Sequence, residues 1–277
     1  SNMQQVPRNV FIRGIIGTDG KATARRIKKN LPPRKFVEAD FSQIELRIAA
    51  MLSGDRELTR AFNSGGDPHT ETASAVTGKD QSLITKEERK MAKAVNFGFL
   101  YGMGWKKFRV YADEKYQVKV TEDEAKQYRK AFFRKYKGLP IWHDRQRRLV
   151  RNLAQVSSPI GRIRHLPTIN SDDDYLKHEA ERQAINSPVQ GFASDLTVLA
   201  MVLLHDRLDR KRGRVIGNVH DSVMFEIDED YIDTAAKIIR ETMENLPLKQ
   251  KFGYTPSIPI EIEISVGDHW GEGEVIA

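Results

Sequence analysis

The sequence predicts an α+β fold in which an antiparallel sheet carries an inserted, mainly helical subdomain. Strand patterns occur near both ends of the 277-residue chain, and the stretch from about residue 60 to 181 has mostly helical periodicity. That middle stretch is also the basic part of the chain. Strands at both ends with helices between them favour a sheet-based domain that carries a helical subdomain.

The first third predicts strands followed by a helix. An apolar run from Val10 to Ile16, followed by an Asp-Gly turn, is typical of a hairpin. A short apolar segment over residues 36–39 ends at Asp40, and residues 42–45 then have the capping-box pattern that opens a helix. Asp40 is therefore expected where a strand gives way to a helix.

Two further capping boxes mark helices in the middle of the chain. They begin at Thr85 and Thr121, and each precedes a long segment with helical periodicity. Another helix is expected over residues 175–185, and a separate one after Pro188, because proline interrupts helical hydrogen bonding.

The last quarter predicts a hairpin, a helix and a strand. Residues 214–219 and 222–227 have strand patterns on either side of His220 and Asp221, which places a carboxylate at the tip of a tight turn. A helix over residues 231–246 and a strand over 258–266 complete the chain.

Composition excludes several classes of site. The chain has no cysteine, which excludes disulfides and thiolate metal sites, so a metal would need carboxylates, carbonyls or histidines. Such ligands favour a hard cation such as Mg²⁺. No uninterrupted run of eighteen apolar residues occurs and the N-terminus has no signal-peptide pattern, so we expect a cytoplasmic protein with no membrane association.

Positive charge is concentrated in the middle of the chain. The formal net charge is +7, whereas residues 86–151 alone contain 19 Lys and Arg against 8 Asp and Glu. A field of that size favours a polyanion such as nucleic acid. A soluble, Lys-rich helical surface has the same excess of positive charge, so charge alone does not decide between nucleic-acid binding and an ordinary solvated surface.

Two aspartates stand at the ends of predicted strands, Asp40 before a helix and Asp221 in a hairpin tip. Neighbouring strands would bring them together. Paired carboxylates of this kind hold the two Mg²⁺ ions of phosphoryl transfer, which lie about 3.5 to 4 Å apart. The alternative is that Asp40 caps a helix and Asp221 is an ordinary turn residue.

The helix that begins after Thr85 carries two cations and then two aromatic residues. Arg89, Lys93, Phe97 and Tyr101 recur at every fourth position and so form one stripe about 18 Å long, close to the length of a nucleoside triphosphate. In that order, cations would bind phosphates and aromatics would pack on sugar and base. The alternative is an amphipathic helix whose aromatic end is in the core, although Gly residues at 98 and 102 favour a close approach or a hinge.

Three segments resemble the motifs of family A DNA polymerases, the bacterial polymerase I class. Residues 40–47, DFSQIELR, resemble motif A; residues 89–102 resemble motif B; and residues 219–221, VHD, resemble motif C. Between motifs B and C, Arg182 and residues 186–191 resemble the segment that tracks primer and template. Both ends of the chain are also similar to this region, so the resemblance spans nearly the whole sequence.

The resemblance implies a palm over residues 3–60 and 182–277 and fingers over residues 61–181. It implies a DNA-directed DNA polymerase core that adds dNTPs to a primer 3′ end on template-primer DNA by two-metal phosphoryl transfer. Two Mg²⁺ ions, replaceable by Mn²⁺, are the implied cofactors. We find no thumb or exonuclease motifs in this sequence, so a separate thumb, exonuclease or processivity partner is left open.

The resemblance also assigns roles to individual residues. Metal binding is implied for Asp40, Asp221 and the Phe41 carbonyl, and Lys93 is placed to act on the pyrophosphate leaving group. Nucleotide contacts are implied for His69, Arg89, Lys93, Phe97, Tyr101, Glu45 and Gln43. DNA contacts are implied for Arg182, Asn186, Gln190, His220 and Arg162, with Arg164 nearby. Glu45 with Tyr101 is expected to exclude a 2′-hydroxyl, and Phe97 is expected to pack on the ribose.

One departure from the family pattern keeps a second enzyme class open. The family usually has Glu after His-Asp in motif C, whereas this chain has Ser222, as single-subunit RNA polymerases do. Glu45 within SQIELR, and Phe97 followed by Gly98, favour the DNA branch. A non-catalytic DNA-binding module is a further alternative, but such a module would not need both aspartates.

Overall fold

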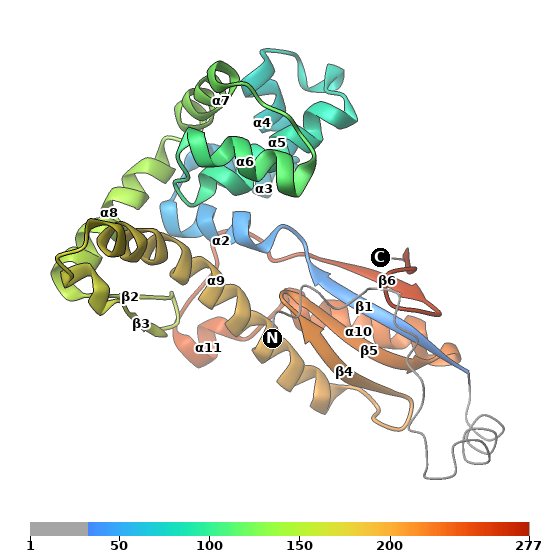
Figure 1. The fold of residues 1–277 in the computed structure, drawn as a ribbon. Helices are drawn as coiled ribbons and strands as arrows, with labels where there is room; N and C mark the ends of the chain where they lie inside the picture. Colours follow the sequence, from blue (N-terminus) through green and yellow to red (C-terminus); the bar gives the residue numbers. More distant parts are fainter. Residues whose placement is uncertain (1–32, 277) are drawn as a thin grey trace, which may run out of the picture. The chain divides into compact units, whose positions relative to one another are not determined.

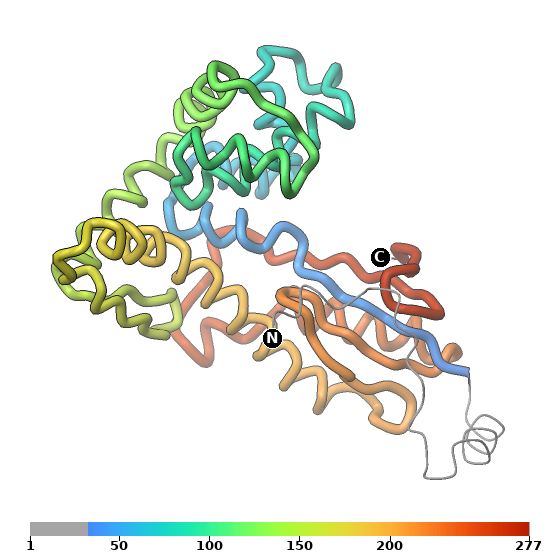
Figure 2. The backbone as a smooth tube through the Cα atoms, viewed as in Figure 1, coloured from blue at the N-terminus to red at the C-terminus, as the bar shows by residue number. Residues whose placement is uncertain are grey.

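The computed structural model describes residues 33–276, whose elements can be followed in Figures 1 and 2. They form two compact units. Residues 33–42, 194–247 and 260–276 form the sheet unit, and residues 43–193 and 248–259 form the helical unit. The hairpin expected over residues 10–20 lies outside the described residues. The division into palm and fingers at residues 60/61 and 181/182 stays a prediction.

The sheet unit is built on a five-stranded antiparallel sheet with strand order β4-β5-β1-β6-β7. Its strands are β1 (Arg34–Phe41), β4 (Gly213–Val219), β5 (Ser222–Asp228), β6 (Ile262–Gly267) and β7 (Glu274–Val275). Strand β1 therefore pairs with β5 and β6, two strands from the last quarter of the chain. The expected α+β class, with an antiparallel sheet, is confirmed.

One face of this sheet is the core of the unit. Alternate residues of a strand point to opposite faces, and Val37, Ala39 and Phe41 of β1 are almost fully buried, at 1%, 0% and 1% exposure. Helix α10 (Ile232–Glu244) packs against β5 and β6. The intervening residues of β1, Glu38 and Asp40, lie on the other face.

The helical unit consists mostly of short helices. They are α2 (Ile44–Ser53), α3 (Arg56–Asn63), α4 (Pro68–Thr77), α5 (Lys86–Leu100), α6 (Trp105–Tyr116), α7 (Glu122–Lys135), α8 (Gly138–Leu153), the first part of α9 (Asp174–Arg207) and α11 (Leu248–Phe252). A small hairpin joins β2 (Gln155–Ser157) to β3 (Ile163–His165), and single 3₁₀ turns cover Gln81–Leu83 and Pro167–Asn170; a third, Glu229–Tyr231, precedes α10. The capping boxes expected at Thr85 and Thr121 are confirmed.

Aromatic packing holds α5, α6 and α7 together. The ring of Phe99 lies 4.4 Å from that of Phe108 and 5.8 Å from that of Phe132, centroid to centroid. A Cβ atom at Gly98 would lie 2.7 Å from Phe108 Cδ2, which is too close. Gly98 therefore permits the close approach of α6 to α5, one of the two reasons that the sequence suggested for it.

The structure corrects two expectations about helices. Helix α9 runs without a break through Pro188, although two helices were expected. Ile185, Val189 and Phe192 are buried on both sides of Pro188, so core packing offsets the cost of a proline inside a helix, about 3 kcal/mol. Helix α9 is also long and apolar enough to pass a test for membrane spans, but core helices pass it too and half of its most apolar stretch is buried.

The second correction concerns the start of α2. The capping box expected over residues 42–45 is wrong, because Gln43 is the N-cap residue, has φ of 52°, and makes no side-chain cap hydrogen bond. Glu45, the expected partner in that box, instead accepts a hydrogen bond from a tyrosine on another element. Tertiary contact has replaced local capping at this position.

Candidate functional site

Asp40 and Asp221 lie side by side in the sheet unit. Strands β1 and β5 pair so that Asp40 faces Ser222, and the backbone N–H of Phe41 donates to the carbonyl of Asp221 over 3.4 Å. Asp221 therefore occupies the position across from Phe41 at the hairpin tip. The register of β1 on β5 therefore brings the two strand-end aspartates together, as the sequence suggested.

Two further carboxylates share the face of Asp40. Glu38 precedes it by two residues on β1, and Glu263 is its direct partner on β6, so both project from the same side of the sheet. The hydroxyl of Ser222 donates to Glu38 Oε1 over 2.6 Å. We refer to Glu38, Asp40, Asp221 and Glu263 as the carboxylate face.

The electrostatics of the carboxylate face favour a bound cation. Burial, followed by the charges of Asp221, Glu38 and Glu263, raises the pKa of Asp40 to about 7. Burial also raises the pKa of Asp221. Negative charge held this close is stabilised by a divalent cation, which supplies the missing opposite charge.

The donor atoms fit a hard cation with incomplete protein coordination. Among residues 33–276, no group of three or more His, Cys, Asp or Glu side chains is arranged to hold a metal ion. Two aspartates and the Phe41 carbonyl would give Mg²⁺ three oxygen donors and leave positions for water and phosphate, which is how Mg²⁺ is usually bound with phosphorylated substrates. Metal binding here stays a prediction.

His220 sits at the turn between β4 and β5 with a backbone φ of 56°. This left-handed conformation costs about 1 kcal/mol for a residue with a Cβ atom. The turn therefore tolerates some strain next to Asp221, as functional turns often do. The expected contact of His220 with DNA stays a prediction.

In the helical unit, the four residues of the predicted stripe share the outer side of α5 and its C-cap. Arg89 and Lys93 are exposed, and Phe97 and Tyr101 are half-buried. The other side of the helix is in the core, where Met91, Ala92, Ala94, Val95, Asn96, Phe99 and Leu100 are buried. The aromatic end of the stripe is therefore not core, and the four side chains present one surface to solvent.

A histidine and an aspartate from α4 lie against this stripe. Asp67 caps α4, accepting from the backbone N–H groups of His69 and Thr70, and also accepts from Arg89 Nε over 2.7 Å. The ring of His69 lies 5.9 Å from that of Phe97. Burial, and the positive charges of Arg89 and Lys93 against the opposing charge of Asp67, lower the pKa of His69 to about 4. His69 is therefore neutral at pH 7.

Glu45 and Tyr101 are directly bonded. The hydroxyl of Tyr101 donates to Glu45 Oε2 over 2.5 Å, which joins the start of α2 to the end of α5. Gln43, two residues before Glu45, has a buried Oε1 with no hydrogen-bond partner among the described residues. The pairing expected of Glu45 and Tyr101 is present, whereas their proposed role toward the sugar is untested.

A cavity of about 530 Å³ brings Tyr101 together with residues of α9. Its lining includes Tyr101, Arg182 and Asn186, all of them expected at the nucleotide or DNA, and also two cations that the sequence did not single out, Lys107 and Arg147. Arg182, Asn186 and Gln190 recur at every fourth position and so lie on one side of α9. The Arg162 side chain lies near Gly191, next to Gln190, and Arg164 is exposed on β3.

Sequence reasoning missed some residues for identifiable reasons. Glu38 alternates with Asp40 along β1, a signal that was present, but its pairing with Ser222 depends on strand register. Glu263 depends on register in the same way. Lys107 and Arg147 are two of many cations in a basic segment, and no sequence signal separates them from the others.

Comparison with known proteins gives one family. DNA polymerase family A matches residues 1–272. Curated relatives include DNA polymerase I, thermostable, of Thermus filiformis, which is 36% identical over 239 residues and covers 86% of this chain, and its counterpart in Thermus aquaticus, 34% identical over 235 residues and covering 85%. The chain spans 27% of the length of each.

A solved structure has a similar fold. The "POL domain of Pol1 from M. smegmatis complex with DNA primer-template and dNTP" superposes with a TM-score of 0.76 at 30% sequence identity. The match covers 95% of this chain and 44% of that one.

Proposed function

Because this chain belongs to DNA polymerase family A, we propose that it is the catalytic core of a DNA-directed DNA polymerase, which adds dNTPs to a primer 3′ end by two-metal phosphoryl transfer. The observation that carries the proposal is the pairing of β1 with β5, which sets Asp40 beside Asp221. Burial, and then the charges of Asp221 and its neighbouring carboxylates, raise the pKa of Asp40 to about 7. Such a pair is suited to hold cations at the reacting phosphate.

The sheet unit would supply the metal site. Asp40, Asp221 and the Phe41 carbonyl would hold Mg²⁺, which activates the attacking hydroxyl and stabilises the leaving oxygen when it is bound. The remaining carboxylates, Glu38 and Glu263, would add negative charge behind these ligands. Mn²⁺ presents similar preferences for oxygen donors and would substitute.

The helical unit would bind the nucleotide. Arg89 and Lys93 would bind the phosphates, with Lys93 next to the pyrophosphate leaving group, and Phe97 would pack on the ribose. The carboxylate of Glu45, held by Tyr101, would close the space that a 2′-hydroxyl occupies. Arg182, Asn186, Gln190 and Arg162 would bind template-primer DNA, largely through its phosphates, and His220 of the sheet unit would contact DNA as well.

Ser222 is the observation that favours a second candidate function, that of a single-subunit RNA polymerase. A serine at this position is what single-subunit RNA polymerases carry after His-Asp. The bonded pair of Glu45 and Tyr101 supports the DNA polymerase, because the Glu45 carboxylate would exclude the 2′-hydroxyl of a ribonucleotide.

Templated primer extension decides between these alternatives. The chain is incubated with a labelled primer-template and Mg²⁺, and with either dNTPs or NTPs. An Asp221→Asn variant purified in the same way serves as the blank, because it reveals any contaminating polymerase from the expression host. We expect template-directed addition of dNTPs by the unmodified chain only. Extension with NTPs in preference to dNTPs would favour the RNA polymerase, and no extension above the blank would reject catalysis by this chain.

A further inference from the structure

A buried chain of polar side chains runs behind the phosphate end of the α5 stripe. It consists of His69 and Thr72 from α4, Asn96 from α5, and Tyr136, which follows α7. Their exposures are 2%, 0%, 0% and 0%. Buried polar groups are costly unless they are hydrogen-bonded, so each of these contacts constrains the next.

The hydrogen bonds fix the orientation of the Asn96 amide. Its Oδ1 accepts from the Thr72 hydroxyl over 2.7 Å, and its Nδ2 lies 2.7 Å from His69 Nδ1 and 3.4 Å from the Pro68 carbonyl. Turning the amide over would place Oδ1 against the Pro68 carbonyl, and two acceptors repel. The amide nitrogen can only donate, so His69 Nδ1 must accept.

The hydrogen bonds of Thr72 and Tyr136, at the other end of this row of side chains, have the same donor-to-acceptor direction. Because the Thr72 hydroxyl gives its proton to Asn96, its lone pairs are left for Tyr136, whose hydroxyl oxygen is 2.9 Å away and therefore acts as the donor. Donation thus runs from Tyr136 through Thr72 and Asn96 to His69.

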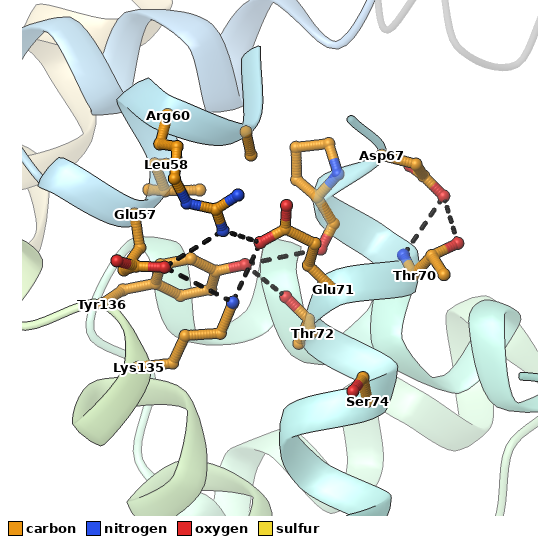
Figure 3. A network of polar contacts seen from close by, with 12 residues as sticks. Glu57, Leu58, Arg60, Asp67, Thr70, Glu71, Thr72, Ser74, Lys135 and Tyr136 are labelled. Atoms are coloured by element: carbon orange, nitrogen blue, oxygen red, sulfur yellow. Dashed lines mark hydrogen bonds and ion pairs between the residues drawn. The ribbon is translucent and has the colours of Figure 1, made fainter. Parts of the chain in front are cut away.

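An ion-pair cluster holds Tyr136 and Thr72 in place. Glu71, adjacent to Thr72 and 4% exposed, accepts from Arg60 and from Lys135, each over 2.9 Å. Lys135 is adjacent to Tyr136, so α3, α4 and the end of α7 are tied at one point. Figure 3 shows Glu71 between Arg60 and Lys135, with the Tyr136 hydroxyl directed at Thr72.

We propose that Asn96 is a positioning residue that fixes His69 as the neutral tautomer with its proton on Nε2, so that the ring donates one hydrogen bond to a phosphate of the incoming nucleotide. This deepens the proposed function and rests on it for the identity of the phosphate. Nε2 has no hydrogen-bond partner among the described residues, which leaves its proton for an outside acceptor. Arg89 and Lys93 attract the phosphate through their positive charge, and the hydrogen bond from His69 Nε2 orients it.

The chemistry of the neighbours supports a neutral ring. Burial and the cations Arg89 and Lys93 lower the pKa of His69 to about 4, despite the opposing charge of Asp67. A neutral imidazole has one donor and one acceptor, so a partner on Nδ1 determines the atom that donates. In this chain the partner of Nδ1 is the amide of Asn96, so Nε2 is the atom that donates.

The direct test reads the tautomer by long-range ¹H–¹⁵N NMR of the full chain at pH 7 without nucleotide. A His69→Gln variant identifies the His69 signals among the seven histidines. We expect the Nε2–H pattern, and a shift of the Nε2 resonance when inorganic tripolyphosphate is added. An Nδ1–H pattern in the unmodified chain, or an Nε2 resonance that tripolyphosphate leaves unmoved, would overturn the inference.

Two variants test the cause. Asn96→Asp replaces the donor with a group that only accepts, so the proton should move to Nδ1 or the ring should become charged. Thr72→Val removes the hydroxyl that orients Asn96, and a mixture of tautomers is expected. Thr77→Val is the matched control, because it makes the same change on α4, where the Thr77 hydroxyl bonds only the backbone of Ala73 and Lys79. An Nε2–H pattern retained in both Asn96→Asp and Thr72→Val would overturn the proposed cause.

Kinetics separate this inference from the proposed function. Thr72→Val should raise the KM for dNTP about tenfold with kcat changed less than about threefold, because phosphate binding in the ground state is weakened. His69→Gln keeps a side-chain N–H donor and should retain part of the affinity. If His69 has the Nε2–H form and responds to tripolyphosphate but no primer is extended, the proposed function fails and the inference stands. Extension by a chain with Nδ1–H would defeat the inference alone.

Discussion

The hydroxyl of Ser222 donates to the carboxylate of Glu38 over 2.6 Å, which links β5 to β1 beside Asp40. Family A polymerases usually have Glu where this chain has Ser222. Here the structure places an acid at the same end of the sheet, but on the neighbouring strand. Glu226, four residues beyond Ser222, is instead bonded to Arg214 and Arg34 over 2.7 and 3.2 Å. Glu38, and not Glu226, is therefore the carboxylate bonded to this serine.

The first prediction concerns Glu38→Gln and stability. The folded-state pKa of Asp40, about 7, lies above its ordinary value, so Asp40 contributes stability at low pH that is lost as the pH rises through 7. Removing the Glu38 charge relieves part of this loss, and Gln can still accept from Ser222. We expect the Tm of the metal-free chain at pH 8 to rise by about 3 °C.

Added Mg²⁺ should then raise the Tm of Glu38→Gln less than that of the unmodified chain, because less repulsion remains to be neutralised. The control is Glu226→Gln, which makes the same change on β5 but breaks ion pairs with Arg34 and Arg214. It should not raise the Tm. Equal Tm values for Glu38→Gln and the unmodified chain at pH 8 would mean that Glu38 does not act on Asp40.

The second prediction concerns the ion pair between Arg89 and Asp67. In the proposed function, a nucleotide phosphate would compete with Asp67 for Arg89, and the negative charge of Asp67 would also repel it. Asn is as good a helix cap as Asp, so Asp67→Asn keeps the start of α4 and releases Arg89. Isothermal titration calorimetry with tripolyphosphate should show an affinity about threefold to fivefold higher. Asp80→Asn, at the cap of Gln81–Leu83, should leave the affinity unchanged.

A lower or unchanged affinity in Asp67→Asn would show that Asp67 orients Arg89 for phosphate rather than competing with it.

The third prediction concerns sugar selection by Glu45. Its carboxylate is held by the Tyr101 hydroxyl, so its position depends on both residues. Glu45→Ala should lower the ratio of kcat/KM for dNTP to that for NTP by about tenfold or more, because it opens space for a 2′-hydroxyl. Tyr101→Phe, which removes one hydrogen bond to the Glu45 carboxylate, should have a smaller effect in the same direction. An unchanged ratio in Glu45→Ala would leave Glu45 with a purely structural role.

The fourth prediction concerns Phe97 and chain terminators. Phe97 is half-buried beside His69 and has no hydroxyl to replace the 3′-OH that a dideoxynucleotide lacks. We expect the unmodified chain to discriminate against ddNTPs. Phe97→Tyr should increase ddNTP use on the order of 10²-fold, about 3 kcal/mol of differential transition-state binding.

Single-nucleotide extension with each ddNTP in competition with its dNTP measures this. Free use of terminators by the unmodified chain, or no change in Phe97→Tyr, would mean that Phe97 does not face the sugar.

Local signals in the sequence predicted much of this fold. A short apolar segment predicted the end of β1, strand patterns on either side of His220 and Asp221 predicted the β4–β5 hairpin, and the capping boxes at Thr85 and Thr121 predicted the starts of α5 and α7. Where a local signal competes with packing, it fails. Pro188 does not end α9, because buried residues on both sides hold the helix together, and Glu45 bonds Tyr101 in place of a cap.

The candidate site also has one part that local sequence signals predicted and another that depends on tertiary contacts. Spacing along one helix predicted the outer stripe of α5, because a four-residue period depends on that helix alone. The partners of these residues come from elsewhere in the chain: Asp67 for Arg89, and Asn96 with Thr72 for His69. Glu38 and Ser222 are separated by 184 positions, and only the register of β1 on β5 brings them together.

Single-turnover primer extension by Asp40→Asn and Asp221→Asn tests the proposed chemistry most directly. With protein in excess over primer-template, the rate reports chemistry, and fluorescence anisotropy of the same duplex reports binding. We predict that each variant extends at least about 10³-fold more slowly in Mg²⁺, while the duplex Kd changes less than about threefold, because the carboxylates bind metal and the basic side chains bind phosphate. Glu226→Gln should behave as the unmodified chain. An extension rate within about tenfold of the unmodified chain in either aspartate variant would contradict this account.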